Sequence, residues 1–200
     1  MEKARIAVLV SGGGTNLQAL LDAQCSGILT SGRIVLVISN NPNAYALERA
    51  NTAGIENKIV TKKEAGTQSA FEQKIIDLLE DRQIDVIVLA GFMSILSEKF
   101  TSRYPERILN VHPSLIPSFC GAGFYGLKVH EEALLYGVKV TGATVHFVNE
   151  SPDGGKIILQ KSVAVRDGDT PEILQKRVME QAEWKILPRA VEMVSKKYRK

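Results

Sequence analysis

Short apolar runs alternate with amphipathic stretches along the first half of the chain. The apolar runs predict buried strands at residues 5–10, 34–38, 59–60, 85–90 and 107–109. Continuously apolar strands are typical of a parallel sheet covered on both faces. Residues 44–53 predict a helix that Gly54 ends, and helical spacing recurs from Phe71 through Ile75 to Leu79. This alternation predicts right-handed βαβ units.

The second half has a different pattern. Residues 139–148 and 156–165 predict two long strands, joined by a turn that contains Asp153, so these strands should be antiparallel. A helix should start at Thr170 and be kinked or broken at Pro188. Residues 62–66 are expected to form a polar loop.

The predicted fold is therefore an α/β, Rossmann-like open twisted sheet. Its N-terminal half is parallel, its C-terminal strands are antiparallel, and helices cover both faces. A single domain over residues 1–200 is expected, made of two halves at 1–105 and 106–200.

Composition narrows the class of protein. Hydrophobic residues make up 44% and charged residues 24%, which is ordinary for a globular chain. The formal charge of +3 gives no reason to expect nucleic acid as a partner. Cys25 and Cys120 form neither a disulfide framework nor a metal-ligand pattern, so no metal is expected. Without a signal peptide or an apolar stretch of ~20 residues, a cytoplasmic protein with no membrane contact is expected.

A glycine-rich turn follows the first strand and precedes a helical run. Its residues are Gly12, Gly13, Gly14, Thr15 and Asn16. Glycines allow close backbone approach to an anion, and the start of a helix supplies free amides and a positive dipole end. The turn lacks the P-loop lysine, and Leu17 replaces the third glycine of a dinucleotide fingerprint. A single phosphate monoester fits better, although an ordinary tight turn remains an alternative.

Asn110 and His112 are two residues apart at the end of an apolar run, so they should share one face of a strand. Pro113 and Pro117 prevent the strand from continuing. The carboxyl ends of strands are where open α/β sheets bind ligands. A catalytic pair is one interpretation, and a hydrogen-bonded pair in a proline-rich turn is the other.

Other segments also carry two interpretations. Residues 93–96 line an apolar ligand pocket or begin a core-facing helix, and residues 118–126 form a mobile lid or a long surface loop. Asp153 is a turn residue or a carboxylate near His112 that favours the imidazolium. His130 is expected to be a helix-end residue, and His146 a structural residue or a support for the catalytic side chains.

Taken together, these motifs resemble the folate-dependent glycinamide ribonucleotide formyltransferase family. The resemblance covers essentially the whole chain. Its most specific parts are residues 11–17, 90–93, 110–115, 145–148 and 153–155. It implies transfer of a formyl group from 10-formyltetrahydrofolate, a cosubstrate, to the amine of glycinamide ribonucleotide in purine biosynthesis, with no metal.

The resemblance also makes residues 1–105 the phosphate-binding half and residues 106–200 the catalytic and folate-binding half, and it implies roles for individual residues. Asn110, His112 and Asp153 match the catalytic trio, and Asn110 also touches the formyl group. Substrate binding falls on Gly12, Gly13, Gly14, Thr15, Asn16 and Glu183; folate binding falls on Gln68, Met93, Ser94, Ile95, Leu96 and Asn110. The partners implied are these two small molecules, and the chain is expected to be a monomer or a homodimer.

Four departures from better-known members stand out. Ser94 and Gln68 occupy positions where an arginine often contacts the folate's acidic tail, Trp184 replaces a frequent histidine, and the loop at 120–129 is longer. Two related enzymes share the central motif: methionyl-tRNA formyltransferase and formyltetrahydrofolate hydrolase. Each is expected to need a further domain for which 200 residues leave no room. A non-catalytic sensor of a phosphorylated metabolite is the rival from another class.

Overall fold

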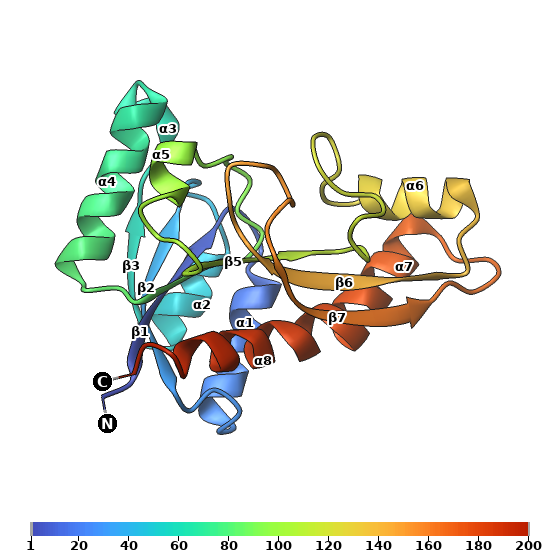
Figure 1. The fold of residues 1–200 in the computed structure, drawn as a ribbon, viewed down its shortest axis with the longest axis horizontal. Helices are drawn as coiled ribbons and strands as arrows, with labels where there is room; N and C mark the ends of the chain where they lie inside the picture. The colour runs from blue at the N-terminus through green and yellow to red at the C-terminus, as the bar shows by residue number, and fades with distance from the viewer. Residues whose placement is uncertain (1, 200) are drawn as a thin grey trace.

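The computed structural model describes residues 2–199 and is built on one sheet (Figure 1). Its strands are β1 (Ala4–Val10), β2 (Gly32–Ser39), β3 (Glu56–Ile59), β4 (Val86–Leu89), β5 (Ile108–His112), β6 (Val140–Phe147) and β7 (Ile157–Ala164). They lie in the order β3-β2-β1-β4-β5-β6-β7. Neighbours from β3 to β5 are parallel, whereas β6 runs antiparallel to both β5 and β7. The Rossmann-like mixed sheet predicted from the sequence is confirmed.

Helices cover both faces of this sheet. They are α1 (Thr15–Cys25), α2 (Ala46–Thr52), α3 (Lys62–Ala65), α4 (Gln68–Asp81), α5 (Glu98–Thr101), α6 (Lys128–Tyr136), α7 (Pro171–Val178), the π-helical η1 (Met179–Glu183) and α8 (Trp184–Ser195). Buried side chains of α1, α2, α7 and α8 form one core with the sheet, and those of α4 and α5 form a second core on the other face.

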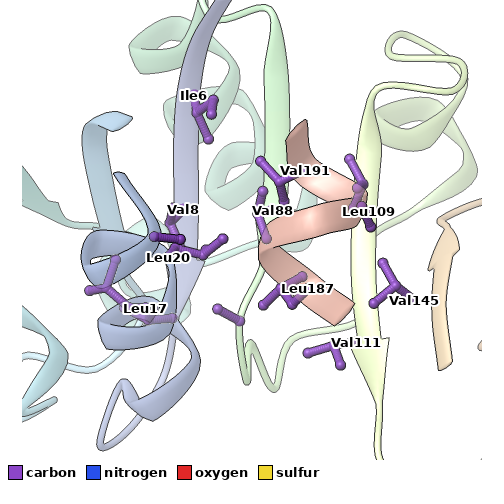
Figure 2. Packing of buried hydrophobic residues seen from close by; sticks show 14 of the residues in the cluster. Ile6, Val8, Leu17, Leu20, Val88, Leu109, Val111, Val145, Leu187 and Val191 are labelled. Atoms are coloured by element: carbon purple, nitrogen blue, oxygen red, sulfur yellow. The ribbon is translucent and has the colours of Figure 1, made fainter. Parts of the chain in front are cut away.

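The periodicity of the sequence explains this layering. In Figure 2, Leu17 and Leu20 of α1 lie beside β1, and Leu187 and Val191 of α8 lie beside β4 and β5. Alternate residues of each central strand face the two cores: Val8 joins the first, and Leu9 the second. A strand buried on both faces must be apolar throughout, which is why the central strands read as continuous apolar runs.

Two local expectations were wrong. Residues 62–66 were expected to form a polar loop, but Lys62–Ala65 is a helical turn. Thr61 caps it, because its hydroxyl accepts a hydrogen bond from the Glu64 amide and donates one to the Glu64 carboxylate. Pro188 was expected to kink or break the last helix, but α8 continues through it. The irregular turn is η1, which ends directly before α8.

The strand order determines where a ligand site can form. The chain passes from β1 outward to β2 and β3, then crosses to β4 on the opposite side of β1. The carboxyl ends of β1 and β4 therefore border a topological switch point, the usual ligand position in open α/β sheets. Among residues 2–199, no helix is long and apolar enough to span a bilayer.

Candidate active site

A cavity of about 650 Å³ opens beside the carboxyl ends of β4 and β5 and the start of α1. Its wall includes Asn16, Met93, Ser94, Ile95, Asn110, His112, His130, Asp153 and Glu183. These residues come from segments far apart in the sequence, and the volume lies in the range of small-molecule sites. The fold thus gathers most of the residues singled out in the sequence around one space.

β5 presents Asn110 and His112 to this cavity. The two residues pair with His146 and Thr144 of β6, which holds them on the same face of a central strand. His112 is buried, and its Nε2 lies 2.8 Å from the Phe119 carbonyl oxygen, to which it donates. Its Nδ1 lies 3.4 Å from the Asp153 carboxylate. Both ring nitrogens face oxygen acceptors, so the ring can hold two protons with a partner for each.

Asp153 is held in place by a tight turn between β6 and β7. A Cβ added at Gly155 would collide with the Phe147 carbonyl, so this close approach requires glycine. Burial alone would raise the Asp153 pKa, but His146, the Gly121 amide and His112 together hold that pKa below its usual value. The carboxylate is therefore ionised at neutral pH.

His146 connects the other members of this cluster. Its Nδ1 donates to the Phe147 carbonyl oxygen at 2.7 Å, and its Nε2 lies 3.2 Å from Asn110 Nδ2 and 3.5 Å from Asp153 Oδ1. The neutral ring accepts from the Asn110 amide, while the protonated ring donates to Asp153. His146 lies behind the cavity wall, the position expected of a supporting side chain.

His130 is a residue whose position the sequence did not reveal. It lies in the first turn of α6, is fully buried, and borders the cavity. Burial, followed by the charge on His112, lowers its pKa from 6.5 to about 4, so the ring is neutral at pH 7. Neither ring nitrogen has a hydrogen-bond partner among residues 2–199. The loop between β5 and α6 brings His130 to the cavity, and no local sequence pattern encodes this position.

The glycine-rich turn leads from β1 into α1. Gly14 caps the helix with φ 72°, and a Cβ there would lie 2.6 Å from the Ala46 side chain, so the turn needs glycine at this position. At Gly12 and Gly13 an added Cβ would meet nothing within 4 Å, so the outer side of the turn is open. The first amides of α1 point out of the helix, which suits an anion.

Glu183 meets Asn16 at the base of the cavity. It belongs to η1 and accepts a hydrogen bond from Asn16 Nδ2 at 2.7 Å. Burial raises the Glu183 pKa from 4.5 to about 7, while the Asn16 amide opposes part of this rise. The carboxyl group therefore changes charge near neutral pH. A substrate hydroxyl would find here either a donor or an acceptor.

The expected folate-binding residues divide into two groups. Met93 and Ile95 are exposed and line the cavity beside Ser94, whose hydroxyl accepts from Asn40 at 2.8 Å. Leu96 instead is buried in the core with α4 and α5. Gln68 is absent from the cavity wall: its amide donates to Glu72 and to the Ile95 carbonyl, so it supports the loop from behind.

The loop between β5 and α6 forms the opposite wall. Residues 121–126 line the cavity, and three of its glycines have positive φ angles. Phe119 packs edge-on against Phe124 with ring centroids 6.4 Å apart, and Tyr125 is 60% exposed at the rim. Aromatic side chains next to conformationally free glycines are consistent with the predicted lid, whose motion stays a prediction.

Residues 2–199 contain no group of three or more His, Cys, Asp or Glu side chains arranged to hold an ion. The titratable groups around the cavity contact one another and backbone atoms instead. The arrangement offers an amide donor, an imidazole next to a carboxylate, and free backbone amides. Such a set can stabilise an oxyanion and move a proton.

Comparison with known proteins identifies the family. The formyl transferase family model matches residues 4–191. The chain is 45% identical over 194 residues to the human trifunctional purine biosynthetic protein adenosine-3, covering 97% of this chain but 18% of that protein. It is 42% identical to the phosphoribosylglycinamide formyltransferase of Escherichia coli, covering 88% of this chain and 80% of the relative.

Solved structures agree with this result. The glycinamide ribonucleotide transformylase 1 of Symbiobacterium toebii superposes with a TM-score of 0.91 at 40% identity, covering 98% of this chain and 89% of that one. The phosphoribosylglycinamide formyltransferase of Brucella melitensis gives a TM-score of 0.88 at 38% identity, covering 97% and 96%. The chain belongs to the formyl transferase family.

Proposed function

We propose that this chain transfers the formyl group of 10-formyltetrahydrofolate to the amine of glycinamide ribonucleotide, a step of purine biosynthesis. The products are N-formylglycinamide ribonucleotide and tetrahydrofolate. The observation that carries the proposal is the meeting of Asn110, His112 and Asp153 in one cavity that Asn16, the last residue of the glycine-rich turn, also lines. Relatives named for this reaction match nearly the whole chain.

The chemistry of the step fits these side chains. The substrate amine attacks the formyl carbon, and the carbonyl oxygen becomes an oxyanion that the Asn110 amide stabilises by donating a hydrogen bond. One such donor is typically worth about 3–4 kcal/mol in the transition state. The bond from the formyl carbon to the folate nitrogen then breaks. His112, which carries a proton opposite Asp153, gives a proton to that nitrogen, and the attacking amine loses one.

The two substrates would occupy opposite parts of the cavity. The substrate's phosphate would bind at Gly12–Asn16, where Asn16 lines this cavity and Thr15 lines the neighbouring one. Glu183 would lie near the ribose, and the amine would then point toward Asn110. The flat folate ring would lie between Met93 and Ile95 on one side and the 121–126 loop on the other. Ser94 and Gln68 carry no charge, so they would attract the acidic tail of folate less than arginine does.

Four further assignments remain predictions of the same proposal. The protein is expected to act on small molecules without a nucleic-acid or membrane partner, and to need no metal. A cytoplasmic location and a monomer or homodimer follow from the sequence reasoning alone. The chain spans 18% of the length of the bovine and human trifunctional relatives. The activity, substrates and partners of the whole protein are therefore part of the proposal as well.

Formyl transfer can be tested directly by absorbance of the deformylated folate, with and without glycinamide ribonucleotide. We expect folate consumption only with the amine substrate, and a loss of about 10²–10⁴-fold in His112→Ala with an unchanged far-UV circular dichroism spectrum. Consumption without the amine would indicate a hydrolase. A third outcome is no turnover, together with binding of a phosphate ligand that His112→Ala leaves intact. That outcome would favour a non-catalytic sensor over an enzyme.

A further inference from the structure

A second cavity, of about 380 Å³, lies between α1 and α8, outside the catalytic space. Its floor is apolar and includes Ala19 and Ala23 of α1 and Pro188 of α8, with Ile28 at the edge. The two helices pack together along this seam. The volume is large enough for a small molecule with a ring system.

Charge at the rim of this cavity is mostly positive. Arg49, Lys185 and Arg189 line it, and Asp22 is the one acidic side chain in its wall. Lys185 and Arg189 are exposed and have no ion-pair partner among residues 2–199, whereas Asp22 already accepts from Gln18 at 2.9 Å. An anionic group at the rim would therefore meet two free cations.

Trp184 supplies an aromatic wall. It is the single tryptophan of the chain and lines the cavity as the first residue of α8. Its Nε1 is buried and has no hydrogen-bond partner among the described residues. An indole face beside guanidinium and ammonium groups is the combination that binds a planar ring carrying an anion.

One thin wall separates this cavity from the catalytic one. Thr15 and Trp184 face the second cavity, while the residues next to them in sequence, Asn16 and Glu183, face the catalytic cavity. Asn16 and Glu183 are joined by a 2.7 Å hydrogen bond. Both pairs lie at the junction of α1 with η1 and α8, so a shift of Trp184 would displace Glu183.

Arg49 makes a second connection between the cavity and the substrate turn. Its Nε donates to the Gly13 carbonyl at 2.8 Å, and its Nη1 donates to Gln18 at 2.9 Å. The same guanidinium therefore borders the second cavity and holds the turn proposed to bind phosphate. An anion that drew Arg49 toward the cavity would loosen this contact.

We propose that the cavity between α1 and α8 binds a small planar aromatic anion with the chemistry of a nucleoside monophosphate, and that its occupancy changes the affinity of the substrate turn. Binding itself is independent of the proposed formyl transfer. The coupling to substrate affinity rests on that proposed function, so the two claims can fail separately.

Trp184 makes binding measurable, because it is the only tryptophan in the chain. The wild-type protein is titrated with adenosine monophosphate, with adenosine and inorganic phosphate as separate probes of the ring and the anion. We expect a saturable change in tryptophan emission with the nucleotide and much weaker responses to either part. The absence of a saturable response to the nucleotide would overturn the proposal.

Charge variants locate the binding site. The double variant Lys185→Ala and Arg189→Ala should weaken nucleotide binding at least about tenfold, since it removes two charge-assisted contacts. The matched control, Lys74→Ala with Lys99→Ala, removes two exposed lysines from α4 and α5 on the other face of the sheet and should change nothing. Equal affinity in both double variants would overturn the proposal.

Saturating glycinamide ribonucleotide distinguishes a second site from the substrate site. For two coupled sites, the apparent nucleotide Kd shifts to a plateau as substrate rises, and the coupling is reciprocal. Simple competition would make that Kd rise in proportion to substrate without limit, which would overturn the second site. His112→Ala, which lies away from this cavity, should bind the nucleotide with unchanged affinity whether or not the enzyme turns over.

Discussion

Asp153 is the residue on which the charges of the catalytic cluster depend. It lies between His112 and His146 and accepts from the Gly121 amide, so three groups share one carboxylate. His112 and Gly121 are far from it in sequence, whereas His146 lies on the strand before its turn. Its position in a glycine turn explains only why the chain bends there. The burial of the carboxylate beside two imidazoles explains why it matters for proton transfer.

Replacing Asp153 with Asn should leave the fold intact and reduce turnover by about 10²–10⁴-fold, because His112 loses the carboxylate that faces its Nδ1 at 3.4 Å. The initial rate of formyl transfer checks this. Asp167→Asn, at a fully exposed carboxylate, is the matched control and should retain wild-type activity. Equal activity in the two variants would remove Asp153 from the mechanism.

Glu183 gives a pH-dependent contribution to stability. Its pKa is about 7 in the folded protein against 4.5 ordinarily, so the folded chain keeps a proton that the unfolded chain loses. Stability is then fully present below pH 4.5 and falls as pH rises toward 7, by roughly 3 kcal/mol in total.

In Glu183→Gln this loss should disappear, because the amide does not titrate. Urea unfolding at pH 4.5 and 7.5 checks the prediction through the change in free energy of unfolding between the two values. The exposed variant Glu150→Gln should retain the wild-type difference. A Glu183→Gln protein with the same pH dependence as wild type would mean that this carboxyl is ionised throughout.

At the scale of elements, α8 is anchored at its far end by Glu192. The Glu192 carboxylate accepts from the backbone amides and the hydroxyls of Thr30 and Ser31, at 2.8 to 3.1 Å. Burial alone would raise the Glu192 pKa, but these donors from Ser31 and Thr30 hold it below its usual value. The segment that enters β2 is thereby fixed to the helix that carries Trp184 at its start.

Glu192→Ala should therefore destabilise the protein by about 2–4 kcal/mol, since it leaves the buried amide and hydroxyl of Ser31 without a partner. The midpoint of urea unfolding at neutral pH measures this. Glu180→Ala is the matched control, because Glu180 makes only an exposed pair with Lys176 at 3.9 Å and such pairs contribute about 1 kcal/mol or less. Similar midpoints for both variants would contradict the anchoring role.

Sequence reasoning succeeded with elements whose burial is periodic. The apolar runs of β1, β2 and β4 and the spacing of α4 gave the correct types, because each buries a fixed set of positions. It failed at Lys62–Ala65, where a Thr61 cap stabilises a short polar helix without any apolar face. It also failed at Pro188, because tertiary packing of Leu187 and Val191 holds α8 together.

At the scale of the whole molecule, the two halves share one sheet and both of the cores that cover it. β4 of the first half pairs with β5 of the second, and α8 packs against α1 at the other end of the chain. The single domain expected from the sequence should therefore unfold in one cooperative transition. Calorimetry is the check, with equal calorimetric and van't Hoff enthalpies expected. Two separated transitions would mean that the halves at 1–105 and 106–200 fold independently.

The sequence by itself determined the strands other than β3, which lies at Glu56–Ile59 rather than at 59–60. It also determined the glycine turn and the placement of Asn110 and His112 on one face of a strand. These features follow from local periodicity and from the backbone freedom of particular residues. Tertiary structure decided which groups meet. It brought His130 and Asp153 to His112, placed Leu96 in the core rather than the cavity, and set a second cavity behind Glu183. Such contacts join residues far apart in the chain, and only the packing of helices on both faces of the sheet creates them.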